Sequence, residues 1–278
     1  MKLTYGYILW PAGERVMDQA YWTDLWKRRE LIFFLAWRDF LVRYKQTAVG
    51  IAWTILKPLA TMVIYTFVFG IIARLPSNEL PYALLVLTGL LPWQLFSVVL
   101  STISESMLAN AHLIGKVYFP RLILPISSLF VCVVDHLISF ILVVLLMLWY
   151  GILPGWQILL LPLVTVLATL SSFGLGLILA TLNSHYRDFR HLIPLALQLG
   201  VFVSPVAYST NLVPEKWMWL YALNPVVGII DAFRWCILNR ADMIYPPSIV
   251  FSAIFSIVTL YFGIRQFRRS EATLIDVM

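Results

Sequence analysis

Long apolar runs separated by short polar segments make up most of this chain. A helix of about 20 residues crosses the hydrocarbon core of a bilayer, and six runs approach or exceed that length. The pattern therefore predicts an all-α polytopic membrane protein with six transmembrane helices. The expected spans are residues 51–72, 82–103, 122–150, 158–182, 192–210 and 248–264.

The fifth run is interrupted in a way that the others are not. It meets Ser204-Pro205, and the apolar pieces 217–223 and 226–238 that follow are each too short to cross the membrane alone. Asn224-Pro225 separates these pieces, and proline favours the first turn of a helix. We expect a re-entrant helical hairpin at 213–240, which is tolerated where protein or a water-filled cavity covers the backbone. The hairpin thus indicates a transport pathway.

Residues 25–46 show helical periodicity before the first span. Phe33, Trp37, Phe40, Leu41 and Tyr44 share one face, and charged residues occupy the other. This pattern predicts an amphipathic helix on the membrane surface, although a soluble helix packed on a partner is the alternative.

The remaining segments of the chain can be assigned around these helices. We expect an N-terminal extension at 1–24, one permease domain at 25–268 and a cytoplasmic tail at 269–278. Within the domain we expect a cytoplasmic loop at 104–121, with helical content from residue 105 to residue 114.

Composition and charge placement support this topology. Hydrophobic residues make up 61% of the chain and charged residues only 12%, which excludes an ordinary soluble domain. Of the 20 lysines and arginines, only Arg74, Lys216, Arg234 and Arg240 fall on the side that carries the hairpin. By the positive-inside rule, both termini are cytoplasmic and the hairpin is external. The net charge of +6 is explained by topology, so we expect membrane lipids and not nucleic acid as partners.

The chain lacks the motifs of an ATPase, a metalloenzyme or a hydrolase. Gly115-Lys116 has Asn110 where the first glycine of a P-loop would stand, and Val117 follows the lysine. The histidines have no metal-ligand spacing, and no nucleophile elbow occurs. We expect no catalytic residues and no metal site, so the energy for transport comes from another chain or from a gradient.

Small residues recur every fourth position along the predicted fourth span. Ala168, Ser172, Gly176 and Ala180 would form a stripe that allows another helix to approach closely.

Aromatic and amide side chains provide candidates for the lining of a channel. Tyr65 and Phe69 share a face of the first span, and Gln198 and Phe202 share a face of the fifth, with Tyr208 beyond. Sugar rings present apolar C–H faces that stack on aromatic rings, whereas their hydroxyls need hydrogen-bonding groups. The alternative is that these aromatic side chains face lipid or the core.

Ionisable residues inside apolar segments are the other candidates. Asp135-His136 lies in the middle of the third run, where it forms either a proton relay or a buried pair satisfied by itself or by a neighbouring helix. Asp231 and Arg234 stand three residues apart in the hairpin and are expected to close an external gate through an ion pair, together with Pro205 and Pro225.

Several local motifs resemble the permease subunit of type-2 ATP-binding-cassette exporters, in the polysaccharide-export branch. The motifs run from residue 25 to residue 268: Trp37-Arg38-Asp39, Arg43-Tyr44-Lys45-Gln46, the run 50–58 ending in Lys57-Pro58, Leu90-Leu91-Pro92-Trp93, residues 116–121, Tyr186-Arg187-Asp188 and Ala222-Leu223-Asn224-Pro225.

The resemblance implies a function and a set of partners. The chain would pair with two copies of a separate nucleotide-binding ATPase subunit, form a homodimer, and move a lipid-linked glycan of the O-antigen, capsule or teichoic acid type across a bacterial inner membrane. The partner would use ATP and magnesium, and this chain would bind no cofactor.

Two further residue sets belong to this hypothesis. The polar segment after the second span would contact the ATPase, with the surface helix as the second part of the docking surface. A lysine and arginine cluster would meet the pyrophosphate of the lipid anchor near the first span. The expected coupling residues are Arg38, Glu105, Asn110, His112 and Lys116, and the expected headgroup residues are Arg43, Lys45 and Lys57.

Two alternatives belong to other classes. A proton-coupled secondary carrier would use Asp135 and His136 as its relay. A membrane-embedded transferase would need a carboxylate or histidine cluster at one interface, and the sequence contains none.

Overall fold

The computed structural model describes residues 19–45, 50–77, 80–114, 119–186, 188–240 and 244–271. All regular structure in these residues is helical, and five helical stretches are long and apolar enough to span a membrane. This confirms the predicted all-α polytopic fold. The stretches are α3 with the π-helix η1 (Ala52–Tyr65 and Thr66–Ile72), α4 (Tyr82–Ala109), α6 (Ile123–Tyr150), the 3-10 helix η2 with α7 (Trp156–Leu160 and Leu161–His185), and α11 (Pro246–Ser270).

The predicted fifth span differs most from the structure. Helix α8 (Phe189–Val203) has only 15 residues, because Ser204 adopts an extended conformation before Pro205, as residues before proline tend to do. After the 3-10 helix η3 (Thr210–Leu212), α9 (Glu215–Tyr221) and α10 (Pro225–Leu238) meet at 104°. The described residues therefore contain five possible spans, or six if α9 and α10 together form one broken span.

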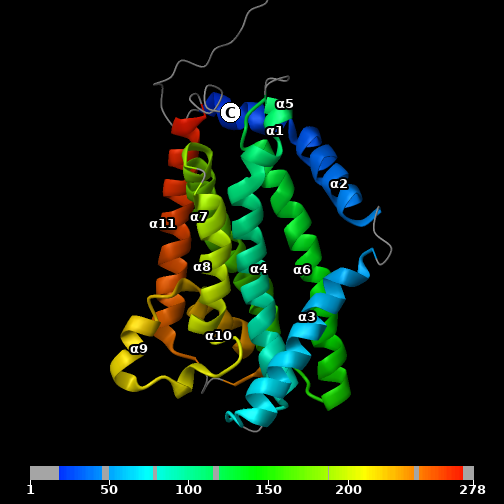
Figure 1. Ribbon diagram of the computed structural model, residues 1–278, viewed down its shortest axis with the longest axis vertical. Coiled ribbons are helices and arrows are strands. Elements are labelled where there is room, and N and C mark those ends of the chain that lie inside the picture. Colours follow the sequence, from blue (N-terminus) through cyan, green and yellow to red (C-terminus); the bar gives the residue numbers. More distant parts are fainter. Residues whose placement is uncertain are drawn as a thin grey trace, which may run out of the picture.

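Helix α4 is the centre of the bundle. Buried residues make up 78% of an apolar 18-residue stretch of α4, but only 11% of the corresponding stretch of the first span. Helix α3 therefore lies at the periphery. Helices α6, α7 and α10 pack around α4, and α11 packs outside α7 (Figure 1). Helices α1 (Gln19–Lys27) and α5 (Ala111–Ile114) lie at one end of the bundle with the end of α11, and α9 lies at the other (Figure 1). We call these the α1 end and the α9 end.

Small residues bring α7 close to two neighbours. A Cβ atom on Gly176 would lie 2.9 Å from the Ile103 side chain of α4, so the predicted small-residue stripe does admit another helix. The closest approach involves Gly174, which lies outside that stripe. A Cβ atom there would lie 2.4 Å from the backbone nitrogen of Leu260, and one on Gly263 would lie 2.3 Å from the carbonyl oxygen of Gly174. The backbones of α7 and α11 are therefore in contact.

The α1 end departs from the predicted boundaries. The helix expected over 25–46 is two helices, α1 and α2 (Arg29–Lys45), and α1 includes Gln19 to Asp24, which belong to the predicted extension. Helix α4 continues to Ala109, past the predicted start of the loop at residue 104, and α5 adds one further turn. Helix α2 slants away from the bundle axis and contacts α6 (Figure 1).

The buried side chain of Tyr21 fastens α1 to the bundle. Its ring lies 3.3 Å from the guanidinium carbon of Arg268, which is a cation–π contact, and its hydroxyl donates to Glu271. The same carboxylate accepts from the backbone nitrogen of Arg121 at 2.8 Å. Helix α1, the start of α6 and the end of α11 are thus joined by one polar cluster.

Candidate functional site

A half-open cavity of about 890 Å³ lies between helices of the bundle. Its walls come from α3, α4, α6 and α8, and the end of α2 forms part of its rim. A volume of this size is typical of ligand pockets, which combine an apolar lining with a small number of placed polar groups. The aromatic lining residues are Tyr44, Trp53, Tyr65, Trp93 and Phe202, and the polar and ionisable ones are Arg43, Thr54, Lys57, Thr61, Gln94, Ser97, Ser101, Asp135, His136, Ser139 and Gln198.

The cavity contains three of the five channel residues predicted from the sequence. Tyr65, Gln198 and Phe202 all line it. Phe69 does not, because it belongs to the π-helix η1, where its ring packs edge-on against Tyr65 with centroids 5.5 Å apart. Tyr208 also lies outside the lining, and its hydroxyl donates to the carbonyl of Phe202 at 3.2 Å.

The contribution of α4 is the part of the cavity that the sequence analysis missed. Trp93 and Gln94 line it, and Ser97 and Ser101 continue the same face one and two turns on. The signal was present as polar residues at helical spacing within an otherwise apolar span, directly after Pro92.

One predicted headgroup residue is already engaged. Arg43 of α2 forms an ion pair with Asp135 of α6, and the same carboxylate accepts a hydrogen bond from the hydroxyl of Tyr44. Burial lowers the pKa of Arg43, but Asp135 outweighs this and the pKa is raised overall. Burial and the bond to Asp135 raise the pKa of Tyr44, so its hydroxyl keeps the proton that it donates. Asp135 therefore secures the end of α2 on the bundle.

Of the other two predicted headgroup residues, only Lys57 lies at the cavity. Its side chain is exposed, and it also lines a second, open groove of about 720 Å³ on the outer face of α3. The other residues of this groove are Trp53, Leu56, Ala60, Thr61 and Ile64. Lys45 is exposed at the end of α2 and lies outside the lining.

His136 has a different partner from Asp135. The imidazole is buried and lies edge-on to Phe233 of α10, with ring centroids 6.0 Å apart. The two neighbours therefore contact different helices, because Asp135 bonds to α2 and His136 packs on α10.

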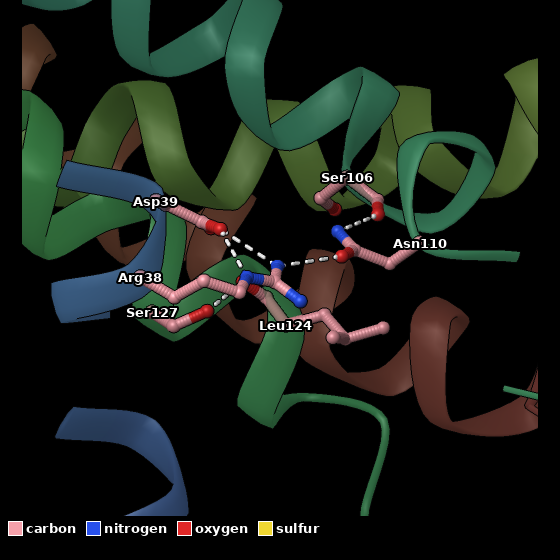
Figure 2. Close-up of polar contacts among 6 residues, drawn as sticks. All are labelled: Arg38, Asp39, Ser106, Asn110, Leu124 and Ser127. Carbon is pink, nitrogen blue, oxygen red and sulfur yellow. Dashed lines mark hydrogen bonds and ion pairs between the residues drawn. The ribbon is translucent and has the colours of Figure 1, made fainter. Parts of the chain in front are cut away.

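At the α1 end, two predicted coupling residues meet directly. The Arg38 guanidinium of α2 donates to the side-chain oxygen of Asn110 at 3.1 Å, while it pairs with Asp39 at 2.6 Å (Figure 2). Asn110 in turn donates to the carbonyl of Ser106 at 3.0 Å. This network connects α2 to the end of α4, close to the residues Leu124 and Ser127 of α6 (Figure 2).

The other predicted coupling residues lie nearby or outside the described residues. His112 is exposed on α5, and Glu105 is half-buried on the last two turns of α4, within the segment 104–121 that was predicted to be a cytoplasmic loop with helical content from residue 105 to residue 114. Lys116 lies outside the described residues.

The predicted gate residues gather at the α9 end, but without the expected ion pair. Pro225 begins α10, where the side chain of Asn224 accepts from the backbone nitrogen of Val226 at 3.1 Å. Asp231 accepts from the Thr210 hydroxyl at 2.6 Å, and Arg234 donates to backbone carbonyls instead of to Asp231. Helical spacing alone suggested a pair, but both side chains point to the segment after α8.

Comparison with known proteins identifies the family. A model of the ABC-2 type transporter family matches residues 30–238, which include α2, the cavity helices α3, α4, α6 and α8, and α10. The chain belongs to the ABC-2 type transporter family. It is therefore the permease, or membrane subunit, of a type-2 ATP-binding-cassette exporter, as the motifs implied.

Curated relatives of this ABC-2 permease carry transport names. It is 31% identical over 220 residues to the O-antigen export system permease protein RfbA of Klebsiella pneumoniae, covering 76% of this chain and 81% of that protein. It is 29% identical over 213 residues to RfbA of Myxococcus xanthus, with the same coverage. It is 25% identical over 244 residues to the polysialic acid transport protein KpsM of Escherichia coli, covering 86% and 92%.

Proposed function

We propose that this permease moves a lipid-linked polysaccharide, of the O-antigen, capsule or teichoic acid type, across the bacterial cytoplasmic membrane. It acts as a homodimer with both termini in the cytoplasm, and two copies of a separate ATPase subunit drive it. The observation that carries the proposal is the cavity of aromatic and amide side chains in a permease whose relatives are named for glycan transport.

The lining suits a sugar chain. The rings of Trp53, Trp93 and Phe202 offer apolar faces to sugar C–H groups, while the amides of Gln94 and Gln198 offer donors and acceptors to hydroxyls. Few of the lining groups are charged, which favours a ligand that is neutral along most of its length.

The anionic end of the substrate would meet Lys57. This ammonium has no ion-pair partner in the described part of the chain, and it lies where the cavity and the outer groove of α3 share Trp53, Lys57 and Thr61. A lipid anchor in the groove would place its pyrophosphate beside a cation. Arg43 contributes less to this site than its charge suggests, because Asp135 neutralises it.

The ATPase would dock at the α1 end. The Arg38–Asn110 contact joins α2 to α4, and α5 presents His112 outward beside it. Movement of this surface would therefore reach α4, which lines the cavity along its length.

Co-purification from the native host tests the docking surface. Tagged permease should retain a soluble ATPase, and Arg38→Gln or His112→Glu should reduce its yield severalfold because each alters the proposed contact surface. Lys216→Glu at the α9 end is the matched control and should leave the yield unchanged. Full yield with both α1-end variants would overturn this docking site, and a permease that always purifies alone would overturn the ATPase partner.

The proton-coupled carrier remains the second candidate, because Asp135 and His136 both line the cavity. Arg43 and Tyr44 occupy the Asp135 carboxylate, however, so a relay would first have to release α2.

A further inference from the structure

The connection between α4 and α6, which contains α5, is held by polar contacts at both of its ends. At the first end, Asn110 accepts from Arg38 of α2 at 3.1 Å and donates to the carbonyl of Ser106 at 3.0 Å. At the second end, shortly before α6, the backbone nitrogen of Arg121 donates to the carboxylate of Glu271 at 2.8 Å. Each end is thus bound to a part of the chain that is distant in the sequence.

Glu271, directly after α11, accepts from three parts of the chain. Besides the backbone nitrogen of Arg121, its carboxylate accepts from the guanidinium of Arg268 at 3.3 Å and from the hydroxyl of Tyr21 at 3.4 Å. The guanidinium of Arg121 donates to the backbone carbonyl of Glu271 as well. The side chains of Arg268 and Glu271 are only 11% and 17% exposed, so solvent screens their attraction less than it does at an open surface. The second end of the connection is therefore attached to the end of α11.

Tyr21 and Arg38 belong to one arm, residues 19–45, which we call the α1–α2 arm. At the junction of its two helices, the backbone nitrogen of Arg28 donates to the carbonyl of Asp24 at 3.1 Å. The backbone nitrogen of Leu31 then donates to the carbonyl of Arg28 at 2.9 Å. Backbone hydrogen bonds thus continue through the junction and couple α1 to α2.

The arm and the bundle form a closed frame around the α4–α6 connection. The frame runs from the end of α4 through Arg38 into α2, along the arm to Tyr21, and through Glu271 to Arg121 at the start of α6. Helices α1 and α5 and the end of α11 lie together at one end of the bundle (Figure 1). A connection that is held at both ends passes a displacement on to its neighbours, whereas one that is held at a single end yields at the other.

Three side chains of this frame lie outside the residues that the family model matches. That match covers residues 30–238, whereas Tyr21 precedes it and Arg268 and Glu271 follow it. Membership of the family therefore assigns no role to these side chains. Tyr21 is nevertheless only 3% exposed, with its ring on the guanidinium of Arg268.

We propose that Glu271 is a positioning residue for export, which together with Tyr21 closes the frame so that a push of the ATPase on α5 reaches α6 and α11 as well as α4. Without Glu271 the connection yields at Arg121, and part of the displacement is lost before it reaches the spans. This role rests on the proposed function, which places the ATPase at the α1 end. It predicts less glycan exported per ATP hydrolysed and unchanged binding of the ATPase.

The ratio of export to ATP hydrolysis tests this role. Surface glycan is measured in the native host, and ATPase yield and ATP hydrolysis are measured on the complex purified from the same cells. Glu271→Ala and Tyr21→Leu should keep the yield and the hydrolysis rate and lower export by about threefold or more. Glu271→Gln should give an intermediate ratio, because its amide oxygen still accepts from the backbone of Arg121. Tyr21→Phe should keep most of the parental ratio, because its ring still lies on Arg268.

Arg269→Ala is the matched control, because this exposed side chain stands in the last turn of α11, next to Arg268, and should leave the ratio unchanged. A parental melting temperature in detergent identifies folded variants. Hydrogen exchange at the backbone amide of Arg121 reports on the contact itself and should accelerate in Glu271→Ala.

The outcomes separate this role from the proposed function. An unchanged ratio in Glu271→Ala and Tyr21→Leu would overturn the role alone, and so would a loss of bound ATPase in step with export, because the role concerns transmission and not binding. If Glu271→Ala does not fold, Glu271→Gln must lower the ratio by itself or the role is wrong. A parent permease that never co-purifies with an ATPase would overturn the proposed function, and this role with it.

Discussion

Single residues decide what the cavity can bind. Asp135 turns Arg43 from a free cation into a structural contact, which leaves Lys57 as the accessible charge at the rim. Gln94 and Gln198, on α4 and α8, are the two amides of the lining. We therefore expect neutral hydrogen bonding, with charge confined to one end, to govern substrate recognition.

Gln94→Leu tests this at one side chain. The change keeps the approximate volume of the side chain and removes a donor and an acceptor. Export should therefore slow severalfold, which corresponds to the net free energy of about one or two hydrogen bonds. Glycan appearing at the cell surface per unit of folded permease measures the effect. Thr165→Val is the control, because that hydroxyl bonds within its own helix at 2.9 Å and lies away from the cavity. Equal slowing by both variants would contradict a recognition role for Gln94.

At the scale of elements, helix contacts depend on where side chains are absent. The α7 and α11 backbones touch at Gly174 and Gly263, whereas Gly176 faces α4. A single helix thus uses two small-residue faces for two neighbours, and its contacts with α11 and α4 are the two most extensive between helices in the described residues.

Gly174→Ala should therefore destabilise the bundle by about 1–3 kcal/mol, because the new methyl group meets the fixed backbone of α11. Thermal unfolding in detergent measures the loss. Gly200→Ala is the matched control, since its methyl group would meet only the tip of the Trp93 side chain, which can shift. The packing account is wrong if Gly200→Ala lowers the melting temperature as much as Gly174→Ala does.

Hydropathy predicted the elements better than their ends. The lipid environment requires long apolar helices, so five predicted spans recur in the structure with shifted boundaries. The end of α8 could not be read from hydropathy, because Pro205-Val206-Ala207 is as apolar as a helix would be and only the backbone preference before proline stops it. Likewise, α4 continues through polar residues because Asn183 and the helix itself satisfy Ser104 and Ser106.

For the whole molecule, tertiary contacts decided what the sequence left open. Tyr65, Gln198 and Phe202 were predictable as lining from their spacing, whereas the partners of Arg234 are carbonyls of a distant helix and of the segment after α8. The proposed docking contacts lie at the α1 end, the cavity is walled by α3, α4, α6 and α8, and α9 lies at the other end of the bundle (Figure 1). That order suits a permease driven by a partner at one end and releasing substrate at the other.

The most direct test of this account is to measure which energy source drives export. Surface glycan would be followed in the native host after an uncoupler collapses the proton gradient while glycolysis maintains ATP, with a strain lacking the permease as the baseline. An ATP-driven permease predicts that glycan dependent on this chain continues to reach the surface. Immediate arrest of export at maintained ATP would contradict the account and return the function to Asp135 and His136.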